Sequence, residues 1–185
     1  MKNIKILGIA GSIRKNSYNK ALLGAAISLA PGGVTIETAD IADLPLFDQD
    51  LETTMPAAVN AFKEKVEKAD AILFVTPEYN YSVPGALKNA IDWASRPYGR
   101  NSFEDKPVAV MGASGSMLGT ARAQYHLRQT FVFLNMHALN KPEVMVASAH
   151  EKFDADGNLT DETTKQKVRE LLEAFAAWTR RLRTE

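Results

Sequence analysis

The chain has no cysteine among its 185 residues. This absence excludes disulfides, thiolate metal sites, Cys-x-x-Cys redox motifs and a cysteine nucleophile, so any redox chemistry must come from a bound cofactor. An excess of charge is also missing, because 22 lysines and arginines balance 22 aspartates and glutamates. The balanced net charge therefore predicts neither binding to nucleic acid nor binding to a membrane surface, and it favours a function that involves a small-molecule ligand or substrate.

Long apolar runs and targeting signals are lacking as well. No apolar stretch approaches the roughly 20 residues of a membrane span, and Met1-Lys2-Asn3 leads directly into a short apolar run without a signal-peptide core. We therefore expect a cytoplasmic protein that does not bind membranes. The length falls within the range of about 100–200 residues for one domain, so residues 1–185 are predicted to form a single domain. The three histidines have no partner at metal-ligand spacing, and no metal site is expected.

Two widespread phosphate-binding motifs are absent. The Gly-x-x-x-x-Gly-Lys-[Ser/Thr] loop does not occur, which argues against a nucleoside triphosphatase. The dinucleotide fingerprint Gly-x-Gly-x-x-Gly is incomplete, since only Gly8 and Gly11 are present after the first apolar run.

A loop of different composition follows that run, which covers residues 4–7. Ser12, Arg14 and Ser17 lie in this loop, just before an Ala- and Leu-rich segment that is predicted to be a helix. Hydroxyls, a guanidinium and free backbone N–H groups at a helix N-terminus make an anion site, here sized for one terminal phosphate. The alternative is an ordinary strand-to-helix turn in which Gly11 relieves backbone strain and Ser17 caps the helix.

Strand-like and helix-like segments alternate along the chain. One strand is predicted to begin at residue 4 and another at residue 107, and three more cover 34–39, 71–75 and 143–148. The predicted helices cover 19–29, 57–68, 118–135 and 161–182, and a further helix begins at Ser82. This alternation predicts an α/β fold, a doubly wound five-stranded parallel sheet in the order 2-1-3-4-5 with helices on both faces. In that order the loops 12–19, 77–82 and 112–116 meet at the carboxyl end of the sheet, where such folds bind ligands.

The loop that starts at Pro77 is the second informative stretch. It combines two tyrosines, an asparagine and a second proline, Pro84, directly after a buried strand. A stiff loop of this kind can place a backbone N–H against a flat heteroaromatic ring. A tight turn with tyrosines on the surface is the alternative.

Taken together, three blocks carry a resemblance to a known family. They are residues 11–19 (GSIRKNSYN), 76–93 (TPEYNYSVPGALKNAIDW) and 121–128 (ARAQYHLR). With them the sequence resembles the NAD(P)H-dependent FMN reductase family of flavodoxin-like flavoproteins, especially its bacterial quinone, chromate and azo-dye reductase members. The resemblance covers nearly the whole chain, and the middle block is its most specific part.

The resemblance implies an FMN site and assigns its residues. The FMN phosphate would be held by Ser12, Arg14, Ser17, Tyr18 and Asn19. The isoalloxazine would be lined by Pro77, Glu78, Tyr79, Asn80 and Tyr81, chiefly through backbone N–H groups near its O4 and N5 edge, and contacted by Ser114. NADPH or NADH would deliver hydride to the flavin, and a quinone or similar acceptor would then take two electrons in the same pocket. No catalytic side chain is required, and none is assigned.

Three functions remain open at this point. The first is the FMN-dependent oxidoreductase, the second is a flavodoxin-type electron carrier without nicotinamide chemistry, and the third is a phosphate-ligand binding domain without turnover. The neutral charge, with Arg14 and Lys15 beside the phosphate, favours the enzyme over a carrier. The preference between NADPH and NADH is open, because Arg14 could pair with a 2′-phosphate or with the FMN phosphate. A homodimer or homotetramer is expected, through the helix that contains Arg122, Tyr125, Arg128, Phe131 and Phe133.

Overall fold

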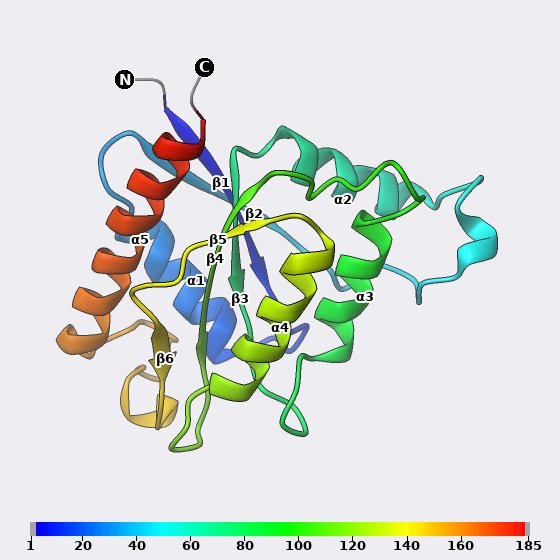
Figure 1. Ribbon diagram of the computed structural model, residues 1–185. Coiled ribbons are helices and arrows are strands. Elements are labelled where there is room, and N and C mark those ends of the chain that lie inside the picture. Colours follow the sequence, from blue (N-terminus) through cyan, green and yellow to red (C-terminus); the bar gives the residue numbers. More distant parts are fainter. Residues whose placement is uncertain (1–2, 184–185) are drawn as a thin grey trace.

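The computed structural model describes residues 3–183. Its strands are β1 (Ile4–Ala10), β2 (Val34–Ala39), β3 (Ala71–Val75), β4 (Pro107–Ala113), β5 (His137–Ala138) and β6 (Val144–Val146). Its α-helices are α1 (Tyr18–Ser28), α2 (Ala57–Lys68), α3 (Gly85–Ala94), α4 (Ala121–Phe133) and α5 (Glu162–Leu182), with short 3-10 turns at Gln49–Leu51 and Ala149–Glu151. Figure 1 shows these elements wound around one central sheet.

The sheet is parallel, in the order β2-β1-β3-β4-β5, with β6 also paired to β4. The predicted strand order is confirmed. In the centre, Leu73 of β3 lies between Gly8 of β1 and Ala109 of β4. All residues of β3 and β4 are buried, as expected for strands covered on both faces.

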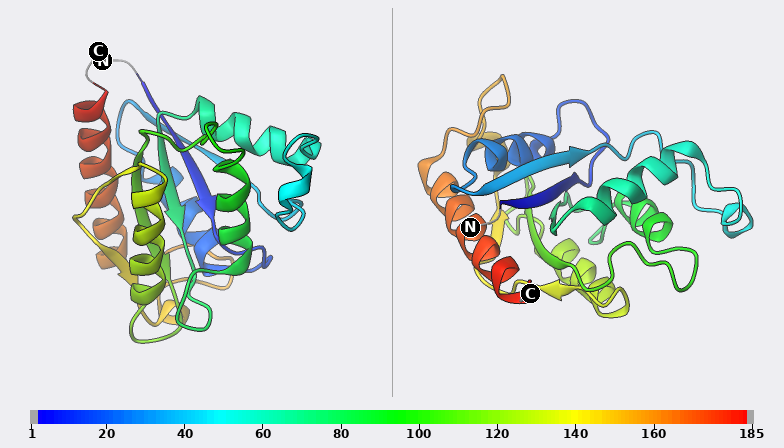
Figure 2. Two further views of the ribbon diagram at one scale, coloured as in Figure 1. Left: turned by 45° about the vertical axis from the view of Figure 1, so that its right-hand side comes forward. Right: turned by 90° about the horizontal axis from the view of Figure 1, so that it is seen from above.

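Helices cover both faces of the sheet. Figure 2 shows α1 and α5 on one face and α2, α3 and α4 on the other. Each layer has its own apolar core: Leu22, Val168 and Phe175 pack on the first face, and Phe62, Leu87 and Phe131 pack on the second. These two cores fix the strands, so the loops after β1, β3 and β4 emerge together at the lower end of the view in Figure 1.

The last strand differs from the prediction. A single strand over residues 143–148 is predicted, but the structure has two short strands along the outer edge of β4. The first pairs His137 with Pro107, and the second pairs Val144 with Met111. Pro142 lies between them and has no N–H to donate to a ladder, which separates the two pairings.

Two helix starts were also predicted wrongly. The helix expected from Ser82 begins at Gly85, with Pro84 at its N-cap and no side-chain cap; residues before a proline avoid the helical region. The helix expected at 118–135 begins at Ala121, because Gly119 has a φ of 60° that an α-helix cannot contain. Among residues 3–183, none of the helices combines the length and apolarity needed to span a bilayer.

Candidate functional site

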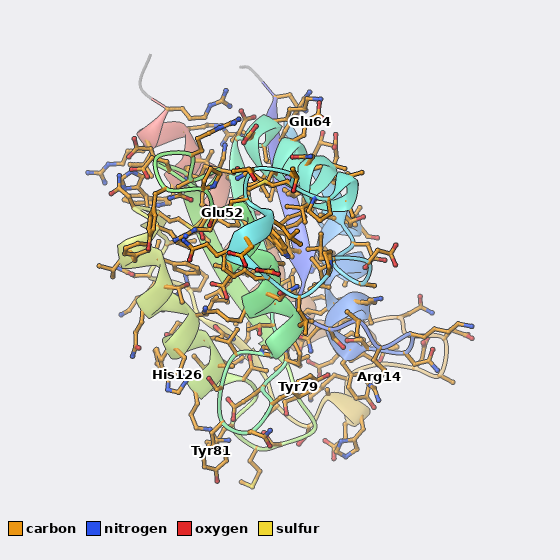
Figure 3. All side chains as sticks on the ribbon, turned by 90° about the vertical axis from the view of Figure 1, so that its right-hand side faces the viewer. Arg14, Glu52, Glu64, Tyr79, Tyr81 and His126 are labelled. Atoms are coloured by element: carbon orange, nitrogen blue, oxygen red, sulfur yellow. The ribbon has the colours of Figure 1, made fainter. Side chains whose placement is uncertain are left out.

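The three loops predicted to converge form one hollow. Its volume is about 380 Å³, within the range of small-molecule sites. Nine of the eleven predicted site residues line it, namely Ser12, Arg14, Ser17, Tyr18, Asn19, Pro77, Glu78, Tyr79 and Ser114, together with Ala113 and Gly115. Figure 3 shows Arg14 and Tyr79 at the same end of the molecule. Asn80 and Tyr81 do not line the hollow.

The loop after β1 presents several backbone N–H groups without a protein acceptor. Ser17 is the N-cap of α1, and its hydroxyl accepts from the Asn19 N–H at 3.2 Å. Ser12 is 3% exposed, and its hydroxyl accepts from the Arg14 N–H at 3.3 Å. Within residues 3–183, the backbone N–H groups of Ser12, Ser17 and Tyr18 donate to no protein acceptor. Free N–H groups at the start of a helix, next to a guanidinium, suit a phosphate.

The side chain of Asn19 is engaged elsewhere. Its amide oxygen accepts from the Ala113 N–H and its amide NH₂ donates to the Ala113 carbonyl, both at 2.9 Å. The amide group therefore joins the start of α1 to the end of β4. Its contact with a phosphate stays a prediction, since both ends of the amide already have partners in the structure.

The loop after β3 folds into a tight hairpin. Tyr79 and Ser82 exchange backbone hydrogen bonds of 3.2 and 2.9 Å around Asn80 and Tyr81. These two residues have φ values of 49° and 65°, and such positive values are uncommon outside glycine. In the described chain the N–H groups of Glu78 and Asn80 have no protein acceptor, so they are available to the edge of a ligand. The Tyr79 hydroxyl lies 3.4 Å from the Ser12 hydroxyl and connects this hairpin to the first loop.

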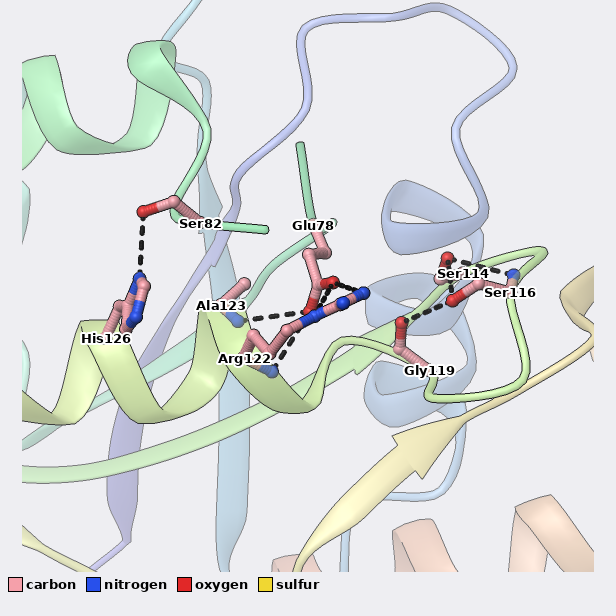
Figure 4. A network of polar contacts seen from close by, with 8 residues as sticks. All are labelled: Glu78, Ser82, Ser114, Ser116, Gly119, Arg122, Ala123 and His126. Atoms are coloured by element: carbon pink, nitrogen blue, oxygen red, sulfur yellow. Dashed lines mark hydrogen bonds and ion pairs between the residues drawn. The ribbon is translucent and has the colours of Figure 1, made fainter. Parts of the chain in front are cut away.

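Glu78 holds this hairpin against α4, as Figure 4 shows. Its carboxylate accepts from the backbone N–H groups of Arg122 and Ala123 at 3.0 and 3.2 Å, and from Arg122 Nε at 2.6 Å. The Arg122 Nη2 also forms an ion pair with it. The Glu78 side chain is only 5% exposed, and its hydrogen bond raises the pKa of Arg122 above the usual value. Glu78 thus caps a helix whose N-cap residue, Thr120, makes no side-chain cap of its own.

Tyr81 points away from the hollow. Its ring is stacked under the Arg122 guanidinium at 3.4 Å, and the residue is 67% exposed. At the far side of the hairpin, the Ser82 hydroxyl and His126 Nδ1 are 3.0 Å apart. The side chains of Tyr81 and Ser82 therefore hold the hairpin against α4, whereas Pro77, Glu78 and Tyr79 line the hollow.

Ser114 closes the third side of the hollow. Its N–H donates to the Val146 carbonyl at 2.9 Å, and its hydroxyl accepts from the Ser116 N–H at 3.1 Å. A Cβ added at Gly115 would meet nothing within 4 Å, so open space lies beside the backbone here. A flat ring can approach this backbone without a side chain in the way.

The hollow fits FMN in its chemistry. One end supplies free N–H groups, hydroxyls and Arg14, as a dianionic phosphate requires. The other end supplies backbone N–H groups and open backbone, as the polar edge and face of a flavin ring require. FMN is the cofactor that would be held here, with the first loop on its phosphate and the other two on its ring.

Two features of the site were missed from the sequence. Arg122 lies within one of the quoted blocks, but nothing in a linear sequence shows that Glu78 caps the helix on which it lies. The turn at 154–157, far from the first loop in the sequence, lies beside that loop in the structure. Both follow from the packing of distant segments.

A hollow at the carboxyl ends of β1 and β3, with free backbone N–H groups on the first loop, is typical of flavodoxin-like nucleotide-binding proteins. The family model described as NADPH-dependent FMN reductase matches residues 4–151, and the chain belongs to this family. It is an oxidoreductase that uses FMN and NAD(P)H.

Individual relatives match over nearly their full length. The chain is 55% identical to an NAD(P)H-dependent FMN reductase of Pseudomonas aeruginosa, covering 98% of each chain. It is 50% identical to an NAD(P)H:quinone oxidoreductase of Solanum tuberosum, covering 94% of this chain and 92% of the relative. Among solved structures, the flavoenzyme NAD(P)H:(acceptor) oxidoreductase of Paracoccus denitrificans superposes with a TM-score of 0.89 at 38% identity, covering 96% of this chain and 98% of that one.

Proposed function

We propose that this protein carries two electrons from NAD(P)H to a quinone or similar small acceptor, through FMN bound in the hollow between the three loops. The observation that carries the proposal is the convergence of Ser17, Tyr79 and Ser114, from three different strand ends, on one hollow. Donor and acceptor would use that hollow in turn, which is a ping-pong mechanism.

The chain's own residues bind and orient in this scheme. FMN, when bound, supplies the chemistry, since it accepts hydride from NAD(P)H and returns electrons to an acceptor. The loop containing Ser12 and Ser17 would hold the phosphate end. The N–H groups of Glu78 and Asn80 would fix the polar edge of the ring, in a position set by the contact of Glu78 with α4.

The names of the relatives support a quinone as acceptor. The potato relative is named as a quinone oxidoreductase, and a Burkholderia relative, 42% identical, as a 2-hydroxy-1,4-benzoquinone reductase. An electron carrier without turnover is not favoured by these names. A phosphate-binding domain without a flavin is not favoured by them either.

Spectroscopy tests the proposal directly. Purified protein loaded with FMN should be yellow, should bleach when NADPH is added without oxygen, and should regain its colour on addition of benzoquinone. Steady-state rates should give parallel double-reciprocal lines. Protein that takes up no FMN would contradict the cofactor site, and bound FMN that NAD(P)H fails to bleach would indicate the electron carrier.

We also propose that the protein is a homodimer or homotetramer that uses the outer side of α4, and that it acts in the cytoplasm. Tyr125, Val132 and Phe133 are 51, 84 and 78% exposed on this helix. Large exposed apolar side chains that lie together are typical of interfaces. Phe131, expected at the same interface, is instead 2% exposed and stacks on Phe74 in the core. Light scattering should give a multiple of the 20.3 kDa chain mass, and a monomeric mass at micromolar concentration would contradict the assembly.

A further inference from the structure

A second hollow lies next to the first, on the other side of the loop after β1. Its volume is about 510 Å³. Arg14, Ser17 and Tyr18 line both hollows, so the two share a wall. The remaining walls come from Lys15 and Asn16, from Lys20 and Ala21 on α1, and from the turn at 154–157.

The turn that closes this hollow is firmly built. The Asp154 carboxylate accepts from the N–H groups of Asp156 and Asn158 at 3.0 and 2.8 Å, and from the Asn158 side chain at 3.0 Å. The ring of Phe153 lies 5.6 Å from that of Tyr18, which attaches the turn to α1. These contacts hold the turn beside α1 and so form one wall of the hollow.

Cations dominate the hollow. Arg14, Lys15 and Lys20 line it, and within the described chain none of them forms an ion pair. Two carboxylates oppose them. They are Asp154, whose carboxylate also accepts hydrogen bonds within its own turn, and Asp156. Three cations without an ion pair against two carboxylates leave an excess of positive charge, which favours an anionic ligand.

NADPH carries a dianionic group that NADH lacks, the 2′-phosphate of its adenosine. A dinucleotide is also longer than FMN, so when its nicotinamide lies on the flavin its other end can extend past the FMN phosphate. The second hollow lies beyond that phosphate loop and shares Arg14 with it.

We propose that this hollow binds the adenosine 2′-phosphate of NADPH, and that Lys15 and Lys20 make the enzyme prefer NADPH over NADH. This inference rests on the proposed function, because it needs NAD(P)H as the donor. Arg14 cannot separate the two sites, since it lines both. Of these two hollows, Lys15 and Lys20 line the second and not the first, and they are the residues to change.

The test compares FMN-loaded wild type with the double variant Lys15→Gln and Lys20→Gln. We expect the ratio of kcat/KM for NADPH to that for NADH to fall roughly tenfold or more, about 1.4 kcal/mol, because only NADPH carries the 2′-phosphate. Lys68→Gln is the control, because Lys68 is exposed, paired with Glu64 and remote from both hollows. In a binding assay without turnover, wild type should bind 2′,5′-ADP more tightly than 5′-ADP, and the double variant should bind both alike.

The outcomes separate this inference from the function. A double variant that keeps the NADPH preference overturns the inference, as does wild type that binds the two nucleotides equally. In both cases bleaching of the flavin by NADPH would leave the proposed function standing. Wild type that is bleached by neither nicotinamide would instead contradict the function itself.

Discussion

Glu78 and Arg122 connect the hairpin of the flavin site to a helix of the scaffold. The Glu78 carboxylate accepts hydrogen bonds from the backbone N–H of Arg122 at 3.0 Å and from its Nε at 2.6 Å. Glu78 therefore both caps α4 and orients the Arg122 guanidinium. The same guanidinium stacks on Tyr81, which has a positive φ. An uncommon backbone conformation is thereby held in place from outside the hollow.

Replacing Glu78 by Gln should loosen this connection. Gln is close in shape but has no charge for Arg122, and hydrogen bonds to charged groups contribute about 1.5–3 kcal/mol. We expect the unfolding free energy of the apoprotein to fall by about 2 kcal/mol, and the Kd for FMN to rise roughly tenfold. Urea unfolding and flavin fluorescence measure the two effects. The control is Lys88→Gln, which removes an exposed ion pair with Asp92 and should change neither the unfolding free energy nor the Kd for FMN. An unaltered Kd in Glu78→Gln would show that FMN binding does not depend on the contact between Glu78 and α4.

Gly112 is the most confined glycine near the site. A Cβ at this position would lie 2.2 Å from both the Thr76 carbonyl oxygen and the Thr120 Oγ1. Since the first of these is backbone directly after β3, Gly112→Ala must push the end of β3 away from β4, and we expect a loss of about 2–4 kcal/mol in urea unfolding. Gly24→Ala is the matched control, because a Cβ there meets nothing within 4 Å in α1; it should add up to about 1 kcal/mol. Equal stability of the two variants would refute the steric argument.

Lys63 is a buried cation that joins α2 to the end of α3. Its Nζ donates to the carbonyls of Ala94, Arg96 and Arg100 at 3.0, 2.7 and 3.2 Å, and burial lowers its pKa. Lys63→Met should leave these carbonyls without their donor, at a cost of about 1–3 kcal/mol. Thermal unfolding should show this as a lower Tm. A Tm equal to that of wild type would mean that water replaces the ammonium group without loss.

Asp161 should make the stability of the protein depend on pH in the acid range. It is the N-cap of α5, and hydrogen bonds from Thr164 lower its pKa from 3.8 to about 2. Because the folded-state pKa lies below the unfolded one, its stabilisation is complete above about pH 4 and is lost as the pH falls toward 2. Asp161→Ala should therefore be about 1 kcal/mol less stable than wild type at pH 7. Urea unfolding at pH 7, 5 and 3 should show this difference shrinking only at pH 3, and a difference that is constant over the series would speak against the assignment.

Much of the fold was predictable because its signals are local. The apolar run at 71–75 predicted β3, and the amphipathic pattern at 57–68 predicted α2, both with the observed bounds. The strand order followed from alternation and from the handedness of crossovers. The division of the predicted last strand into β5 and β6 could not be predicted in this way, because it depends on which residues of β4 each of the two strands pairs with.

The candidate site was predictable to the same degree. Loop composition and the family resemblance indicated nine residues that line one hollow. The orientation of Tyr81 could not be predicted, since it depends on a guanidinium from another helix. The placement of the turn at 154–157 beside the first loop likewise depends on how α5 packs against α1.

The side chain of Asn19 joins two parts of the candidate site. Its amide presents a C=O and an N–H to Ala113 in the way that a peptide group of a neighbouring strand would. A side chain thus extends the hydrogen-bonding pattern of the sheet by one position, between the phosphate end and the ring end of the flavin site. The loop predicted to hold the phosphate and the strand that ends beside the predicted ring position are thus joined by the two hydrogen bonds of one side chain, which spans the hollow beneath both ends of the cofactor site.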